Sequence, residues 1–182
     1  MSDTVDDASK SAVKNAVPGA VLEGLPPVLD AHTRLIVLGS FPGVASLQAQ
    51  QYYGHPRNHF WPILAALWGT ELMVMPYDAR LVEARRHGLG LWDVYSSCRR
   101  EGSLDSAIEH AQLNDLASLP RLAPMLRVIV HNGGESARAM AHTRALGVAV
   151  LRLPSTSPAN ASWSFARKLA AWRAALQEHG VA

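Results

Sequence analysis

Cysteine is almost absent from this sequence: Cys98 is the only one among 182 residues. A disulfide scaffold needs paired cysteines, and a zinc or iron–sulfur site built from thiolates needs about four such donors. The composition therefore excludes both, and we expect no cofactor, no metal and no iron–sulfur cluster. A reduced compartment fits this cysteine content, so we expect a cytoplasmic protein.

Long hydrophobic runs are also missing. No stretch approaches the roughly 18 apolar residues that a membrane span requires, and no basic segment followed by an apolar one marks a signal peptide. Residues 1–17 are rich in Ser, Asp, Ala and Lys without an apolar period, which predicts a flexible leader. Residues 18–182 then form a single domain, long enough to bury a core, which we expect to be monomeric.

Lysine is scarce beyond the first 30 residues. The net charge is +2, but residues 1–30 hold five acids and two lysines, leaving fifteen basic and ten acidic residues in the remainder. All fifteen except Lys168 are arginine, which suits bidentate contacts to phosphate. The total charge alone favours a small-molecule enzyme, whereas the basic remainder also fits a nucleic-acid partner. A genomic bias toward arginine explains the composition equally well.

Apolar strand-like runs alternate with helical patterns along the chain. This alternation with short connections predicts an α/β fold, a three-layer α/β/α sandwich with a central, mostly parallel four-stranded sheet. In the last helix Phe165, Leu169, Trp172 and Leu176 form one apolar stripe that we expect to face the sheet. The predicted strands are 34–40, 89–94, 127–131 and 148–153, and the predicted helices before the last one are 60–68, 77–87 and 135–144.

Ligands of such sheets bind beyond the carboxyl ends of the strands. The loops at these ends are GSFPG, WDVYSSC, HNGG and LPSTSPAN, and we expect them to share one cleft. The stretch from Gly39 to Trp61 lacks the patterns of a phosphate-binding loop, a dinucleotide fold or a serine hydrolase. His55 and His59 have the spacing of metal ligands, but Pro56 breaks the early turn and the adjacent Glu of a zinc protease is missing.

The same stretch resembles the first active-site motif of the uracil-DNA glycosylase superfamily. The matching segments are Gly39–Gly43 (GSFPG) and His55–Trp61 (HPRNHFW), followed by HNG at the third strand and LPSTSP after the fourth. The hypoxanthine-DNA glycosylase branch, also called DNA-deoxyinosine glycosylases, is the most similar, since it also shares GSLDSAI at Gly102–Ile108. The likeness runs from about Leu35 to the last helix, with its motifs in the expected order.

The resemblance implies a monofunctional DNA glycosylase of base excision repair with a uracil-DNA glycosylase-like fold. Its partner is DNA containing deaminated bases, hypoxanthine first and then uracil, which it flips out and hydrolyses with a positioned water. No lysine in the motifs can form a Schiff base, so strand cleavage is not expected. Two alternatives remain open: a uracil or G:U mismatch-specific glycosylase, and a non-catalytic DNA- or nucleotide-binding domain.

The catalytic residue implied by the resemblance is Asn58. The mismatch-specific branch uses an Asn in the turn, whereas this chain has Phe41, which cannot accept a hydrogen bond from water. In the hypoxanthine branch the Asn of the HPRN segment is credited with catalysis. An amide can orient water without a shifted pKa. The alternative is that Asn58 only caps the helix that begins near His59.

Three residues are candidates for binding the base. Tyr53 aligns with the aromatic that stacks on the flipped base, Asn132 can contact the base edge through its amide, and Phe41 can form an opposing wall. The alternatives are a core tyrosine, an Asn favoured by the Asn-Gly-Gly turn, and burial of the phenyl ring against the sheet.

Ser155, Ser157 and Arg57 are candidates for contacting DNA, with loop capping and a solvated cation as the alternatives. Gly39, Ser40 and His55 are further cleft candidates. The superfamily often has a His where this chain has Leu153, so strong assistance to the departing base is not expected from this position. His55 and His131 are possible substitutes, although a lone His is more often structural. Asp93 is a candidate for a second polar group in the cleft, but a strand-end hydrogen bond is the favoured role.

Overall fold

The computed structural model describes residues 19–181, so the predicted leader at 1–17 lies outside the described residues. At its centre is a four-stranded sheet in which all neighbouring strands are parallel, as the sequence predicted. The strand order is β3-β2-β6-β7. These strands are β2 (Leu35–Gly39), β3 (Leu89–Asp93), β6 (Val128–Asn132) and β7 (Ala149–Leu153).

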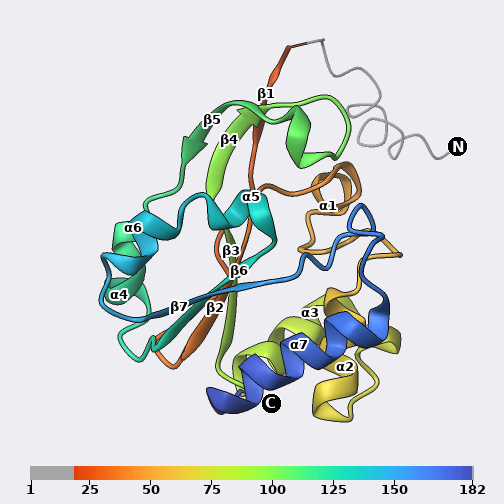
Figure 1. Cartoon of the computed structure of the whole chain (residues 1–182), viewed down its shortest axis with the longest axis vertical. Coiled ribbons are helices and arrows are strands. Elements are labelled where there is room, and N and C mark those ends of the chain that lie inside the picture. The colour runs from red at the N-terminus through yellow and green to blue at the C-terminus, as the bar shows by residue number, and fades with distance from the viewer. Residues whose placement is uncertain (1–18, 182) are drawn as a thin grey trace, which may run out of the picture.

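Helices cover both faces of this sheet (Figure 1). Alternate residues of a strand point to opposite faces. Leu35 and Val37 accordingly join the core beneath α2 (Phe60–Trp68), α3 (Tyr77–Arg86) and α7 (Phe165–Glu178). Ile36 and Leu38 join the core on the other face, with α4 (Leu119–Leu122), α5 (Gly134–Ala137) and α6 (Met140–Arg144). The predicted three-layer sandwich is therefore confirmed.

Two helical predictions need correction. The helix predicted at 135–144 is interrupted, because Ala139 N donates to Ser136 O in a tight turn that separates α5 from α6. The predicted apolar stripe of α7 is wrong at Phe165, which is 36% exposed and packs edge-on against His59 instead of the sheet. Leu169, Trp172 and Leu176 do belong to the core.

A second, antiparallel sheet was not predicted. It has the order β1-β4-β5 and consists of β1 (Val21–Glu23), β4 (Tyr95–Arg99) and β5 (Glu109–Leu113). WDVYSSC is therefore mostly strand and not a loop. Val94 and Tyr95 donate their backbone N–H groups to the carbonyls of Gly39 and Ser40, which carries strand pairing past the end of β3. The remaining short helices are α1 (Val44–Ala49), η1 (Leu72–Val74), η2 (Asp105–Ala107) and η3 (Leu116–Ser118).

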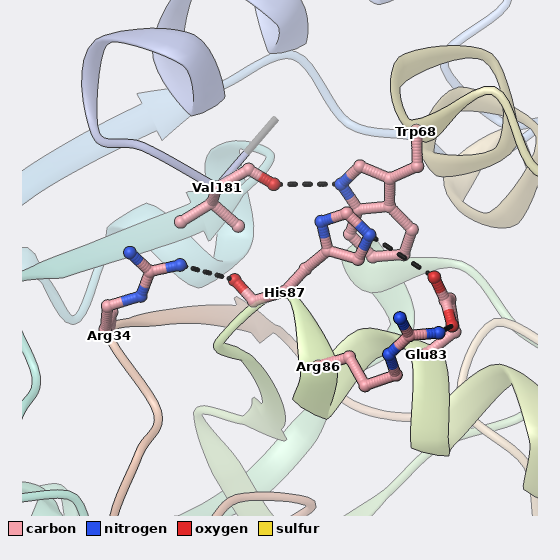
Figure 2. A network of polar contacts seen from close by, with 6 residues as sticks. All are labelled: Arg34, Trp68, Glu83, Arg86, His87 and Val181. Carbon is pink, nitrogen blue, oxygen red and sulfur yellow. Dashed lines mark hydrogen bonds and ion pairs between the residues drawn. The ribbon is translucent and has the colours of Figure 1, made fainter.

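The amino ends of the strands are closed by a network of polar contacts, shown in Figure 2. Trp68 Nε1 donates to Val181 O at 2.8 Å, and its ring stacks on His87 with centroids 4.0 Å apart. Arg34 Nη2 donates to His87 O at 3.1 Å, and Glu83 pairs with the His87 ring at 3.4 Å. This network joins α2, α3, the start of β2 and the end of the chain. None of the helices in residues 19–181 is long and apolar enough to cross a membrane.

Candidate functional site

A cleft of about 410 Å³ lies at the carboxyl ends of the parallel strands. Residues from GSFPG, from LPSTSPAN and from the end of β6 line it, so these loops meet as predicted, while WDVYSSC contributes only Asp93. Arg57 does not line the cleft and is exposed at its outside. The predicted site residues that do line it are Gly39, Ser40, Phe41, Tyr53, His55, Asn58, Asn132, Ser155 and Ser157.

The GSFPG turn forms one wall and is held by charged groups behind it. Phe41 is buried, and the Arg100 guanidinium lies 5.2 Å from the centroid of its ring. Arg100 Nη2 also donates to Pro42 O. Ser40 Oγ donates to Asp105 Oδ1 at 2.6 Å. These contacts fix a turn whose aromatic side chain faces the cleft on one side and a cation on another.

Asn58 combines a helix-start contact with a position on the cleft wall. Its Oδ1 accepts a hydrogen bond from Phe60 N at 2.9 Å, at the beginning of α2. A carbonyl oxygen has two lone pairs, so this contact leaves one lone pair for a water. Arg57 N donates to His55 Nδ1 at 3.1 Å, and this tight turn orients the segment that carries Asn58. Asn58 therefore contacts the start of α2, although His59 and not Asn58 occupies the N-cap position, and this contact does not compete with a water.

Tyr53 is held in an unusual backbone conformation. Its φ is +55°, in the left-handed region that bulky residues rarely adopt. Its ring stacks on Phe60 with centroids 4.0 Å apart. The hydroxyl is buried without a hydrogen-bond partner among residues 19–181, and burial, followed by the nearby Asp93, raises the pKa of this phenol. The surrounding structure thus fixes a strained aromatic at the cleft.

Asn132 is bound to the LPSTSPAN loop through both atoms of its amide. Nδ2 donates to Thr156 Oγ1 at 2.9 Å, and Oδ1 accepts from Thr156 N at 3.0 Å. One N–H of the amide remains for a ligand. Gly133 follows at a φ of +98°, where a Cβ would lie 2.8 Å from Ser155 Cβ. Only glycine allows the end of β6 to approach the loop this closely.

The LPSTSPAN loop is fixed from the protein side. Its four successive carbonyls at 154–157 accept hydrogen bonds from Trp172 Nε1, Asn160 Nδ2, His59 N and Lys168 Nζ, at 3.0 to 3.1 Å. Ser155 Oγ accepts from Ser157 N, and Ser157 Oγ accepts from Ala159 N, each at 3.2 Å. The predicted loop capping by both serines is therefore present. Their hydroxyl protons stay available to a ligand.

His131 is part of the buried framework and does not line the cleft. Ser136 Oγ donates to Leu38 O at 2.7 Å, so it accepts from His131 Nδ1 at 2.8 Å. The ring Nε2 lies 2.9 Å from Thr143 Oγ1. Burial lowers the pKa of His131 to about 4, so the ring is neutral. Of the two histidines considered as aids to the departing base, only His55 is at the cleft.

Two acidic residues also line the cleft, Asp93, for which a structural role was favoured, and Asp105, which the sequence does not single out. Burial raises the pKa of Asp93 to about 7. The nearby Asp105 adds to this rise, and the positive charge of Arg100 opposes it. The Oδ2 atom of Asp93 is buried and has no hydrogen-bond partner in the described part of the chain, so the predicted strand-end hydrogen bond from its side chain is not formed there. Asp105 lies in GSLDSAI, a segment that carries part of the family resemblance but does not by itself place this residue at the cleft. Within residues 19–181 no group of three His, Cys, Asp or Glu side chains could hold a metal ion.

The family model described as uracil DNA glycosylase superfamily matches residues 26–177. Among curated proteins, the chain is 39% identical over 138 residues to the hypoxanthine DNA glycosylase of Methanosarcina barkeri, covering 76% of this chain and 87% of that protein. It is 37% identical over 157 residues to the hypoxanthine DNA glycosylase of Methanosarcina acetivorans, covering 86% and 99%.

Among solved structures, the chain is similar to a solution NMR structure from Methanosarcina acetivorans, provisionally described as a uracil DNA glycosylase. The TM-score is 0.80 at 36% sequence identity, and the match covers 88% of this chain and 99% of that one. The similarity therefore includes both the sheet and the loops that line the cleft.

Proposed function

The chain belongs to the uracil DNA glycosylase superfamily, and from this premise we propose that it is a DNA glycosylase of base excision repair that removes hypoxanthine in preference to uracil. Two relatives at 37–39% identity bear the name hypoxanthine DNA glycosylase. The observation that carries the proposal is one cleft that gathers Tyr53, Asn58 and Asn132 from three separate segments. We also propose that residues 18–182 act as a single domain, as a monomer and in the cytoplasm.

Asn58 holds the attacking water in this proposal. Cleavage of an N-glycosidic bond develops positive charge on the sugar and negative charge on the departing base. A weak nucleophile such as water then needs position more than activation. Asn58 supports this role because Phe60 N fixes its amide while one lone pair of Oδ1 stays free for water.

The flipped base lies against Tyr53 and is contacted at its edge by Asn132, with Phe41 as the opposing wall. Stacking on an aromatic contributes about 1–3 kcal/mol per base. Tyr53 supports this role because Phe60 and the strained backbone hold its ring in place. Asn132 supports it because Thr156 fixes the amide plane and leaves one N–H for the base.

Ser155, Ser157 and Arg57 contact the DNA backbone. Phosphate contacts position a duplex without determining the base. The serine hydroxyls stand on a loop whose carbonyls at 154–157 are engaged within the protein, and Arg57 is exposed beside the cleft. We expect duplex binding to weaken steeply with added salt, because phosphate contacts release counterions. Salt-independent binding would instead favour a small-molecule ligand.

The reaction stops at base removal. Lys168 is the only lysine of residues 19–181, and it is 1% exposed with its Nζ bound to Ser157 O at 3.1 Å. Burial also lowers its pKa. An amine that braces a loop from inside cannot reach C1′, so we expect no Schiff base and no strand cleavage without alkali.

The test is an excision assay on duplex oligonucleotides that contain one inosine, one uracil or only undamaged bases, followed by alkaline cleavage of abasic sites. We expect excision at inosine above all. Preferential excision at uracil would favour a uracil or mismatch-specific enzyme. Binding without excision of either base would favour the non-catalytic alternative.

Two variants of Asn58 separate water positioning from capping. Asn58→Ala removes both functions, whereas Asn58→Ser retains a good helix-cap acceptor but shortens the side chain. If Asn58 positions water, both variants lose at least about 100-fold in the excision rate. If it is only a cap, Asn58→Ser retains the parent rate.

A further inference from the structure

Asp93 occupies a fixed position in the wall of the cleft, and its buried Oδ2 has no hydrogen-bond partner among the described residues. It is the last residue of β3 and pairs in register with Gly39. Its backbone O accepts from Asn114 Nδ2 at 2.8 Å. A Cβ at Gly39 would lie 2.3 Å from Asp93 Oδ1 and 3.5 Å from the Tyr53 hydroxyl, so glycine makes room for both groups. Asp93 itself is only 4% exposed and lines the cleft.

The groups around Asp93 favour its protonated form. Asp105, on η2, is a like charge, while Arg100, after β4, is the one opposing cation among the charged neighbours described. Three phenols face Asp93 from the remaining elements, Tyr52 and Tyr53 before α2 and Tyr77 on α3. Burial dominates, and the pKa of Asp93 rises to about 7. A carboxylic acid with a proton to give is therefore present near neutral pH.

The cleft otherwise offers little to a departing anion. Its described lining contains no lysine and no arginine, and its ionisable side chains are two aspartates, two tyrosines and His55. Leu153 belongs to the core, and His131 is bound to Ser136 and Thr143. An ionised base would thus face carboxyl groups with no cation in the lining itself to balance its charge. A base that leaves as a neutral molecule avoids this repulsion.

We propose that Asp93 is a catalytic residue that donates its proton to a ring nitrogen of the departing purine. This role rests on the proposed function. The C1′–N9 bond breaks and its electron pair goes to the purine, while the Asp93 proton is transferred to N7 or N3, so hypoxanthine leaves neutral. Water held by Asn58 adds to C1′ and releases a proton to solvent. The Asp93 carboxylate then takes up a proton from solvent before the next turnover.

Such a proton donor also accounts for a purine preference. Hypoxanthine has the acceptors N7 and N3 in addition to the nitrogen bonded to the sugar, and protonation at either one withdraws electrons from the breaking bond. Uracil has no such ring acceptor and offers only its carbonyl oxygens. A neutral carboxylic acid at the end of β3 therefore assists loss of a purine more than loss of a pyrimidine.

The test compares the parent protein with Asp93→Asn in single-turnover excision of hypoxanthine from about pH 5.5 to pH 9. General acid catalysis contributes about 100- to 10,000-fold, so we expect a loss in that range. The parent rate should fall as pH rises above about 7, whereas the variant profile should be flat there. Asp78→Asn, which changes an exposed aspartate of α3, serves as the matched control and should behave as the parent.

Two further measurements keep the test decisive. Binding of Asp93→Asn to a duplex with a non-cleavable 2′-fluoro analogue of deoxyinosine shows that the variant folds and should match the parent within about threefold. With 7-deaza or 3-deaza deoxyinosine, the analogue lacking the protonated nitrogen should be cleaved equally slowly by parent and variant. A parent-like rate and pH profile in Asp93→Asn, or a loss that persists with both analogues, overturns the role of Asp93. No excision by the parent protein overturns the proposed function itself.

Discussion

The two ends of the central sheet differ in whether their buried polar side chains find hydrogen-bond partners within the protein. At the amino end, Trp68, His87 and Arg34 satisfy one another and the carbonyl of Val181 (Figure 2). At the carboxyl end, buried polar atoms are left without partners within the described residues. Six buried side-chain atoms of the described residues lack a partner. Five of them belong to Tyr53, His59, Asp93 and Arg100, which line or adjoin the cleft, whereas the sixth, Thr70 Oγ1, lies just after the end of α2.

This difference separates the stable part of the molecule from the reactive part. A buried polar atom without a partner costs about 1–3 kcal/mol, so a fold retains few of them. Of these residues Tyr53 and Asp93 line the cleft itself, so theirs are the hydrogen bonds that a bound substrate can complete. Substitutions at the carboxyl end should therefore lose activity and can gain stability, whereas those at the amino end should lose stability and retain activity.

The largest expected effect is a gain in stability for Asp93→Asn. An unfolded Asp loses its proton near pH 3.9, whereas Asp93 in the folded protein does so near a pKa of about 7. Between these values the folded chain holds the additional proton, so its free energy of unfolding falls as pH rises. We expect the variant to exceed the parent by up to about 4 kcal/mol above this range, where the parent carries the buried charge.

Urea unfolding of both proteins at several pH values measures this difference, and His131 titrates equally in both. A difference that stays constant from about pH 4 to pH 8 would show that Asp93 carries no buried, uncompensated charge.

The next effect is a loss of activity in Gly39→Ala. The new Cβ would lie 2.3 Å from Asp93 Oδ1, so the carboxyl group must move. A displacement of about 1 Å costs roughly 100-fold in rate. Single-turnover excision measures it, with Gly69→Ala as control, since nothing lies within 4 Å of a Cβ there and only its positive φ is strained. Equal rates in both variants would contradict a role for close packing at Gly39.

A smaller effect is expected for Trp68→Phe at the amino end. The substitution retains an aromatic ring beside His87 but removes the hydrogen bond from Nε1 to Val181 O. We expect a loss of about 1 kcal/mol in the free energy of unfolding and an unchanged excision rate. A large change in the excision rate with unchanged stability would contradict the claim that the amino end serves stability and the carboxyl end serves activity.

Glu83→Gln should have the smallest effect. Glu83 pairs with Arg86 at 3.0 Å and His87 at 3.4 Å, but the Arg86 side chain is 73% exposed. Pairs of this kind contribute less than about 1 kcal/mol. Thermal unfolding should shift by no more than a few degrees, with the excision rate unchanged; a loss comparable to that of Trp68→Phe would contradict this ranking.

The four central strands and the principal helices were predictable from the sequence because apolar runs and helical spacing report burial directly. The strand β4 was not, because Tyr95–Arg99 (YSSCR) lacks the alternation of apolar and polar residues that marks a strand, and its partner β1 comes from a distant part of the chain. The interruption between α5 and α6 depends on the turn at Ser136.

The site was only partly predictable, because a motif identifies residues but not the contacts between distant segments of the chain. Asn58 and Asn132 lie in motifs whose order along the chain could be compared with a family, and both line the cleft. Asp105 meets Ser40 only because β4 and β5 fold back over the turn, a contact across 65 positions in the sequence. Arg57 neighbours Asn58 in sequence but is exposed outside the cleft. A motif does not determine the direction of a side chain in a turn, so this position could not be predicted.

The titration of Asp93 itself is the most direct test of its role as a proton donor. Carbon-13 NMR of the aspartate carboxyl groups, assigned by comparison with Asp93→Asn, follows its protonation in the intact protein. If Asp93 is the proton donor, its apparent pKa lies at about 7, so that the acid keeps its proton near neutrality. A pKa near the ordinary value of about 3.9 would contradict it, because Asp93 would then be an ionised, solvated carboxylate with no proton to donate.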